Sequence, residues 1–358
     1  LTPGKVAAKK KKPRKTAKSE KALKDTKIAS DEVTLFYGNS FVERLQEDAT
    51  LESLFHAAKP GKKQQFRSFA FTGDEVGFRI RPSKFGDHLS YLTTQVNPDR
   101  VVMCFGMNES FAGTEGLPTF TKNLKSYLEI IQGRHPKSKL TLVSPTAVEG
   151  TNTEKRNADI AAYTAVMEQV AKEKEIAFID LYTPSKTLFE KSSTPLTSNG
   201  LHLNQAGNHV IGKMLARKLN PDAKFDTVDT TTTGFKALRK LVARKVYEMQ
   251  MAYRPSNGIH YYGTRAREFE YVAEIPHHLK LTNILDVAIW NQAKDLSREF
   301  AFPTLPVEQA DPPPLKPRKG LGVIKTSEED LKDFTVADGF EVNLFASSED
   351  HPELVNPL

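Results

Sequence analysis

Two hydrophobic periods alternate along the first 220 residues of the chain. Short apolar runs, typical of buried strands, lie at residues 33–37, 65–71, 101–105, 140–143 and 176–181. Between them, apolar residues recur every three or four positions, which predicts helices over residues 41–58, 117–132, 153–174 and 205–219. Strands that alternate with helices of this length predict right-handed βαβ units, and therefore a parallel sheet covered by helices on both faces.

The pattern changes after residue 220. A Thr-rich connector leads into a basic helical stretch at 236–251, and another helix is predicted at 281–300. The aromatic loop between them, with Tyr253, Tyr261 and Tyr262, either stacks on a sugar ring or packs the extra helices onto the main domain. The chain is thus divided into a Lys-rich disordered linker (1–30), an α/β domain (31–220), a helical extension with the aromatic loop (221–302), a Pro-rich linker (303–333) and the strand-like start of a further domain (334–358).

The positive charge of the chain belongs to its first segment. Residues 1–30 contain ten lysines and one arginine against two acidic residues, a net charge of +9, so the other residues carry −2 of the total of +7. Because the folded part is nearly neutral, no nucleic-acid partner is expected. The basic segment is interpreted as a solvated linker. The alternative, binding of DNA or anionic lipid, predicts an affinity that salt weakens and that deletion of residues 1–30 abolishes.

The cysteine count and the length of the apolar runs exclude several classes of protein. Cys104 is the single cysteine, which excludes an internal disulfide framework and a cysteine-based zinc site. No apolar run approaches the roughly 18 residues that a membrane-spanning helix needs. The chain begins with Leu1 and not with Met, so we expect a fragment or a processed start.

Polar side chains gather in four segments that follow predicted strands or precede the closing helix. These segments are Gly38-Asn39-Ser40, Phe71-Thr72-Gly73-Asp74, Gly106-Met107-Asn108-Glu109 and Ser198-Asn199-Gly200-Leu201-His202. Because sites in open parallel sheets form at the carboxyl ends of the strands, the four segments are expected to meet there.

The four segments supply the parts of an acyl-transfer site. The Ser40 hydroxyl becomes a nucleophile only when a base takes its proton, and His202 is suited to this role near neutral pH. The tetrahedral intermediate carries an oxyanion, for which the backbone N–H groups of Ser40 and Gly73 and the amide of Asn108 are candidate donors. Taken alone, Ser40 is interpreted as a helix N-cap, because Glu43 three residues later would complete a capping box.

The ordered set of segments resembles the SGNH (GDSL-type) hydrolase superfamily of esterases and lipases, over roughly residues 31–220. The family carries a Gly-Asp-Ser turn, a Gly, a Gly-x-Asn-Asp segment and an Asp-x-x-His segment, in the order of the segments quoted above. The resemblance implies an α/β fold, a flavodoxin-like three-layer α/β/α sandwich with a five-stranded parallel sheet. It also implies a nucleophile (Ser40), a base (His202), its orienting partner (Asn199) and the oxyanion donors named above. Neither a metal nor an organic cofactor is expected.

Departures from the family pattern bear on activity. Three aspartates of the family stand here as Asn39, Glu109 and Asn199. The third of these carboxylates fixes the tautomer of the histidine, and its replacement by Asn in a serine triad costs about 10⁴ in rate. Asn39, Glu109 and Arg79 are candidates for substrate binding. Arg79 is suited, with Arg81, to an anionic or sugar substrate, unless both belong to a solvated face.

Two functions stay open at this point. The first is a serine esterase that cleaves a small-molecule or carbohydrate ester, with O-acetyl groups as candidate substrates. The second is a degenerate SGNH domain that binds a glycan or a partner without turnover. Asp180, after the fifth strand, is either a stand-in acid for His202 or an ordinary turn residue.

The end of the chain carries a second resemblance. The stretch "DGFEVNLFASSEDHPELVNP" resembles the opening of a dehydrogenase-type β-propeller in large exported proteins of planctomycetes and verrucomicrobia. The resemblance implies a multidomain protein that is exported to the periplasm or the extracellular space. It also implies that the Lys-rich segment is a linker behind a removed signal peptide.

Overall fold

The computed structural model describes residues 28–77, 85–254, 274–307 and 326–347, which fall into two compact units, Leu1–Gln309 and Ala310–Leu358. The first unit contains the whole sheet together with the helices of the region 221–302. Among the described residues, no helix is both long enough and apolar enough to cross a membrane.

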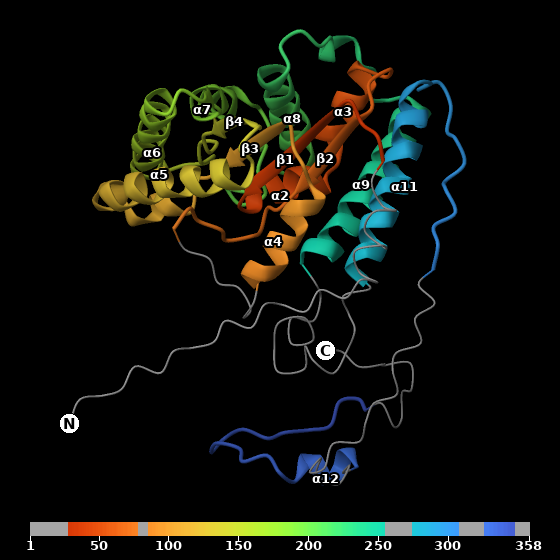
Figure 1. Cartoon of the computed structure of the whole chain (residues 1–358). Coiled ribbons are helices and arrows are strands. Elements are labelled where there is room, and N and C mark those ends of the chain that lie inside the picture. The colour runs from red at the N-terminus through yellow and green to blue at the C-terminus, as the bar shows by residue number, and fades with distance from the viewer. Residues whose placement is uncertain (1–27, 78–84, 255–273, 308–325, 348–358) are drawn as a thin grey trace, which may run out of the picture. The chain divides into compact units, whose positions relative to one another are not determined.

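Five parallel strands form one sheet in the order β2-β1-β3-β4-β5 (Figure 1). The strands are β1 (Glu32–Gly38), β2 (Gln64–Ser68), β3 (Arg100–Cys104), β4 (Lys139–Val143) and β5 (Ala177–Ile179). In the register, Leu35 of β1 lies opposite Arg67 of β2 and Val101 of β3. This is the strand order of the flavodoxin-like fold, so the predicted five-stranded α/β/α sandwich is confirmed.

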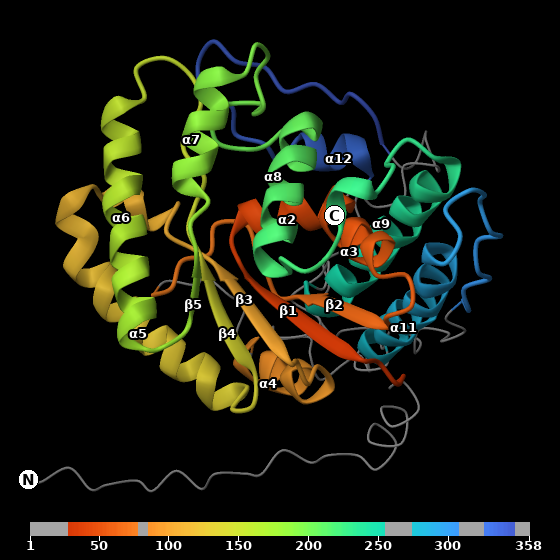
Figure 2. The same cartoon turned by 90° about the horizontal axis from the view of Figure 1, so that it is seen from above.

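Helices cover both faces of the sheet, as Figure 2 shows from above. On one face lie α2 (Ser40–Glu47), α3 (Thr50–Ala58) and α8 (Gln205–Leu219); on the other lie α4 (Phe85–Gln95), α5 (Leu117–Arg134) and α6 (Glu154–Glu173). Successive strand residues point to opposite faces. Phe36 therefore packs in the first layer, whereas Leu35 and Tyr37 pack in the second. Burial on both faces explains why the strands read as unbroken apolar runs.

The helix predicted over residues 41–58 is interrupted. It breaks into α2 and α3 at Ala49, whose φ of 66° lies in the left-handed region. The buried residues Leu45 and Leu51 are six positions apart, a spacing that one helix face does not accommodate. In the α/β region, α4 and α7 (Tyr182–Lys191) were not predicted. The buried face of α7 consists of Ser185 and Phe189, which is too little apolar surface to reveal a helical period.

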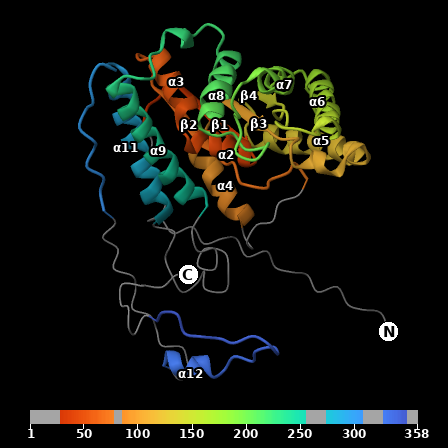
Figure 3. The same cartoon turned by 180° about the vertical axis from the view of Figure 1, so that it is seen from behind.

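Two long helices, α9 (Thr233–Tyr253) and α11 (Glu274–Ala293), lie side by side beyond the β2 edge of the sheet (Figure 3). Their existence was predicted, but α11 ends seven residues before the predicted end. The buried Gln292 explains this difference, because it closes a turn formed by residues 295–300. Its Nε2 donates to two carbonyl oxygens of the turn, at 3.0 and 2.8 Å, and its Oε1 accepts from one N–H at 2.9 Å.

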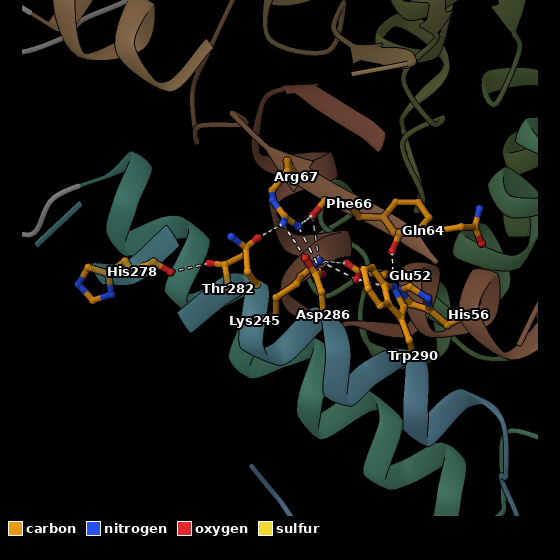
Figure 4. Close-up of polar contacts among 11 residues, drawn as sticks. Glu52, His56, Gln64, Phe66, Arg67, Lys245, His278, Thr282, Asp286 and Trp290 are labelled. Carbon is orange, nitrogen blue, oxygen red and sulfur yellow. Dashed lines mark hydrogen bonds and ion pairs between the residues drawn. The ribbon is translucent and has the colours of Figure 1, made fainter. Parts of the chain in front are cut away.

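The helix pair closes the open edge of the sheet. Within the sheet β2 pairs with β1 alone, so its outward backbone groups need other partners. Trp290 of α11 donates from Nε1 to the carbonyl oxygen of Gln64 (2.7 Å), and Lys245 of α9 donates from Nζ to that of Phe66 (3.0 Å) (Figure 4). Side chains of the helices thus take the place of a further strand.

Buried ion pairs fix the same interface (Figure 4). The Lys245 Nζ atom lies 2.6 and 2.5 Å from the two carboxylate oxygens of Glu52 on α3, and both side chains are almost completely buried. Burial alone would raise the pKa of Glu52, but the Lys245 ammonium holds it below the ordinary value. On β2, Arg67 pairs with the buried Asp286 of α11 at 2.5 Å. Each helix of the pair thus contributes one buried charged side chain, which is paired with an oppositely charged side chain of α3 or β2.

The second unit is described over residues 326–347. Its helix α12 (Ser327–Leu331) lies in the stretch that was predicted to be an extended linker, and Thr326 and Glu329 form a capping box at its start. Residues 334–347, predicted to be strand-like, contain no strand. The further domain after them remains a prediction.

Candidate active site

One cavity of about 420 Å³ opens at the carboxyl ends of the strands. Ser40 and Asn39 line it after β1, Gly73 after β2 and Asn108 after β3, and His202 lines it from the loop before α8. The parallel sheet therefore brings together five of the residues singled out in the sequence. Asn199 and Glu109 do not line the cavity. Asn199 contacts His202, and Glu109 contacts the backbone of the loops after β2 and β3. Arg79 and Arg81 are outside the described residues.

Ser40 is the first residue of α2, and its hydroxyl is not used as a cap. Asn39 is the N-cap instead, with Oδ1 accepting from the N–H of Phe41 at 3.1 Å. The predicted capping box does not form, because the carboxylate of Glu43 accepts from Arg254 and from Thr72 Oγ1. Among the described residues, no hydrogen bond engages Ser40 Oγ. Its backbone N–H, at the first helical position, has no acceptor within the helix.

The loop that carries Gly73 is held from two sides. Gly73 has a φ of 78°, which a residue with a side chain rarely adopts. A Cβ atom there would meet nothing within 4 Å, so the backbone conformation and not space calls for glycine. Thr72 donates to Glu43 of α2, and the Arg254 guanidinium lies 4.2 Å from the centroid of the Phe71 ring. These contacts fix the Gly73 N–H relative to Ser40.

Asn108 projects from a loop that Arg156 of α6 holds in place. The Arg156 guanidinium donates to the carbonyl oxygens of Met107 (2.9 Å) and Ser110 (2.7 Å), and it lies 3.7 Å from the centroid of the Phe111 ring. Among the described residues, no hydrogen bond engages the side chain of Asn108. Its amide is therefore available to a ligand in the cavity.

Glu109 joins two of the loops beneath the cavity. Its buried carboxyl accepts from the N–H of Val76 (3.0 Å) and from the N–H of Gly106 (2.9 Å). It does not line the cavity. Burial raises its pKa to about 7, although the backbone hydrogen bonds favour the charged form. The contacts of Glu109 are thus with the protein backbone, between the loops after β2 and β3.

Asn199 determines where His202 carries its proton. Oδ1 of Asn199 accepts from the backbone N–H groups of His202 (2.9 Å) and Leu201 (3.3 Å), and Nδ2 faces Nδ1 of His202 at 3.1 Å. The reverse orientation of the amide would turn its NH₂ group against two N–H donors. Nδ2 therefore donates to Nδ1, and neutral His202 carries its proton on Nε2. A carboxylate in this position would favour the opposite tautomer.

The loop that carries His202 is tied to the loop after β4. The carboxylate of Glu149 accepts from the N–H of Leu196 (2.9 Å) and from both the N–H (2.7 Å) and the Oγ1 (2.5 Å) of Thr197. Gly200, with a φ of 82°, passes so close that a Cβ would lie 2.8 Å from the Glu149 carbonyl oxygen. These contacts fix the direction from which His202 enters the cavity.

Two effects favour the neutral form of His202. Burial lowers its pKa, and the positive charge of Arg44 lowers it further. Among the described residues no acid offsets them: Asp180 accepts from the N–H of Thr183 (3.0 Å), as a turn residue does, and it makes no contact with His202. At neutral pH the imidazole is therefore uncharged.

Several polar residues of the cavity were not found from the sequence, and three of them bear on its chemistry. Arg44, Glu75 and Asn208 line it. Arg44 follows Ser40 by four positions on α2 and therefore shares its helix face, a signal that the sequence did contain. Burial raises the pKa of Glu75. The amide oxygen of Asn208 is buried and has no hydrogen-bond partner among the described residues.

Of the three tyrosines of the aromatic loop, Tyr253 alone lies among the described residues. Tyr253 is buried and stacks on Phe69 with 5.0 Å between the ring centroids, which is the packing alternative considered above. Tyr261 and Tyr262 lie outside the described residues. Across the part of the chain that the structure describes, no cluster of three or more His, Cys, Asp or Glu side chains is suited to a metal ion.

Comparison with known proteins finds a family match over part of the chain. Residues 36–210 match the GDSL-like Lipase/Acylhydrolase family. A GDSL esterase/lipase from Arabidopsis thaliana is 25% identical over 146 residues, a match that covers 35% of this chain and 60% of that protein. The match thus spans less than two thirds of the length of this relative.

Solved structures with a similar chain trace include esterases. One is a catalytic mutant of Axe2, an acetylxylan esterase from Geobacillus stearothermophilus, with a TM-score of 0.42 and 19% identity over 56% of this chain and 98% of that chain. Another is the lipase/acylhydrolase from Enterococcus faecalis, with a TM-score of 0.41 and 21% identity over 55% of this chain and 100% of that chain.

Proposed function

We propose, on the basis of the match of residues 36–210 to the GDSL-like Lipase/Acylhydrolase family, that the protein hydrolyses carboxylic esters with Ser40 as the nucleophile. The observation that carries the proposal is the shared cavity, in which His202 occurs together with a Ser40 hydroxyl and an Asn108 amide that no described residue engages. The Ser40 and Gly73 N–H groups complete a set of three donors for an oxyanion.

In this proposal, the reaction has two halves. Ser40 Oγ attacks the ester carbonyl carbon while its proton passes to Nε2 of His202, and the negative charge that develops on the carbonyl oxygen is stabilised by the three donors. The imidazolium then gives its proton to the departing alcohol, which leaves an acyl-serine. Water, deprotonated by His202 in the same way, releases the acid and restores Ser40.

Asn199 limits the rate of this reaction. Nε2 accepts the serine proton only when neutral His202 has its own proton on Nδ1, and the Asn199 amide favours the other tautomer. We therefore expect an esterase whose turnover is roughly 10⁴-fold below that of a carboxylate-supported site. Phe111, 65% exposed at the cavity, offers an apolar face on which a sugar ring could stack, which favours acyl groups on carbohydrates as substrates.

The same amide favours a second candidate function. With Nε2 protonated, His202 joins Asn108, the Ser40 hydroxyl and the backbone N–H groups as a hydrogen-bond donor to the cavity. Such a site binds a carbonyl-containing ligand without cleaving it. The two functions differ in a single observable, the dependence of ester cleavage on Ser40.

The test is the hydrolysis of 4-nitrophenyl acetate by the wild-type protein, by Ser40→Ala and by a matched control, Ser126→Ala, on the exposed side of α5. We expect the wild type and Ser126→Ala to cleave the ester at equal rates above the spontaneous rate, and Ser40→Ala to have lost this excess. Equal, background rates in all three proteins would reject the esterase proposal and leave the binding function.

A further inference from the structure

Arg44 projects into the cavity from the same helix face as Ser40. It is solvent-exposed, lines the cavity and acts electrostatically on His202. Among the described residues, its guanidinium forms neither a hydrogen bond nor an ion pair. The cavity therefore contains a cation whose counter-ion is not a side chain of the described protein.

Other arginines close to the site are engaged. Arg156 donates to backbone carbonyl oxygens, and Arg254 pairs with Glu43. Both hold loops of the cavity wall. Arg44 holds none, so a structural role does not account for its position.

Asn208 provides a second, independent observation. It is only 8% exposed, it lines the same cavity, and its amide oxygen has no hydrogen-bond partner among the described residues. A buried acceptor without a donor costs stability unless a ligand or water supplies the donor. The cavity wall thus includes a buried polar group for which the described protein supplies no donor.

We propose that the ester bound in this cavity carries a carboxylate, which Arg44 binds. One planar guanidinium matches a carboxylate by two parallel N–H···O bonds. Arg44 is the one cation among the described cavity residues, whereas phosphate sites usually gather several.

The carboxylate would also assist the reaction. The positive charge of Arg44 opposes the imidazolium that His202 becomes when it takes the serine proton. A bound anion neutralises that charge and makes the proton transfer easier. This assistance rests on the proposed esterase function, whereas binding of the carboxylate does not.

Binding is tested with amide analogues that lack the reactive ester. One pair places the charge on the alcohol side, 4-acetamidobenzoate against the neutral 4-acetamidobenzamide. The other places it on the acyl side, N-phenylsuccinamate against 4-methyl-N-phenylpentanamide. Dissociation constants are measured by calorimetry for the wild type, for Arg44→Gln and for Lys122→Gln, which removes one positive charge from the exposed face of α5.

We expect the anionic member of at least one pair to bind roughly tenfold more tightly in the wild type and in Lys122→Gln, and this preference to vanish in Arg44→Gln. No preference in either pair, or a preference that survives in Arg44→Gln, would overturn the proposal. The result is independent of turnover: a Ser40→Ala protein that binds with the same preference supports the carboxylate site even if no ester is cleaved.

Discussion

The amide nitrogen of Asn199 faces Nδ1 of His202 at 3.1 Å, while the amide oxygen of the same side chain accepts from the backbone N–H of His202. The histidine is therefore held at two points by one side chain. The backbone contact is the one that a carboxylate oxygen could also make. The difference from a carboxylate lies entirely in the second atom, which donates where an oxygen would accept.

The Asn199→Asp substitution changes that one atom. The new carboxylate would accept from Nδ1–H, place the free lone pair of His202 on Nε2 and stabilise the imidazolium. We expect kcat for 4-nitrophenyl acetate to rise by about 10²- to 10⁴-fold with little change in KM. The gain should be absent from the double variant Ser40→Ala/Asn199→Asp. An unchanged kcat in the single variant would mean that His202 does not serve Ser40 as a base.

Glu149 is expected to act on the reaction through the His202 loop. In Glu149→Gln an NH₂ group replaces one oxygen that now accepts from Thr197, so two donors would face each other. We expect kcat, measured in the Asn199→Asp background, to fall roughly tenfold with KM nearly unchanged, because the base is displaced and the oxyanion donors are not. Glu154→Gln, an exposed carboxylate at the start of α6, is the control and should leave kcat unchanged.

Glu109 predicts how stability depends on pH. Its pKa of about 7 in the folded protein exceeds the ordinary value of 4.5, so between these values the folded chain holds a proton that the unfolded chain has lost. Stability contributed by this group is therefore present at low pH and is lost as pH rises towards 7. We expect the Tm of the wild type to fall relative to that of Glu109→Gln between pH 5 and pH 8. The exposed Glu168→Gln should show no such pH-dependent difference; the same slope in both variants would contradict the assignment.

The Lys245–Glu52 pair predicts a large loss of stability when it is broken. Lys245→Met leaves the Glu52 carboxylate buried without its main counter-ion and the Phe66 carbonyl oxygen without the lysine donor. We expect a loss of about 3–5 kcal/mol in the free energy of unfolding, measured with urea. Lys240→Met, at an exposed position of the same helix, should cost little. The double variant Glu52→Gln/Lys245→Met should recover part of the loss, since no buried charge is then left unpaired.

Much of the fold was predictable, because local pattern and tertiary burial agree. The run Val101–Phe105 is buried on both faces of the sheet and is therefore apolar throughout. Its buried position could thus be predicted from the apolar run in the sequence. The turn after α11 was not predictable, because Gln292 closes it with side-chain hydrogen bonds that leave no period in the sequence. The break at Ala49 leaves only the six-residue spacing between two leucines.

The candidate site divides in the same way. Ser40, Gly73, Asn108 and His202 were predictable as a group, because each follows a strand or precedes the closing helix and strand ends converge. The orientation of the Asn199 amide was not, because the backbone N–H groups that fix it are defined by the loop conformation. The availability of the Arg44 guanidinium was not predictable, because it depends on the absence of a hydrogen-bond or ion-pair partner among the described residues of the folded chain.

The way in which the helix pair meets β2 has a consequence for association between molecules. Trp290 and Lys245 donate to the backbone carbonyl oxygens of Gln64 and Phe66 at the edge of β2. A strand from another chain would need these acceptors in order to extend the sheet. Strand addition at this edge, the first step of edge-to-edge aggregation, therefore requires α9 and α11 to detach. Detachment would leave Glu52 and Asp286 buried without their counter-ions or exposed to water, so the buried charges protect the protein against polymerising through its own sheet.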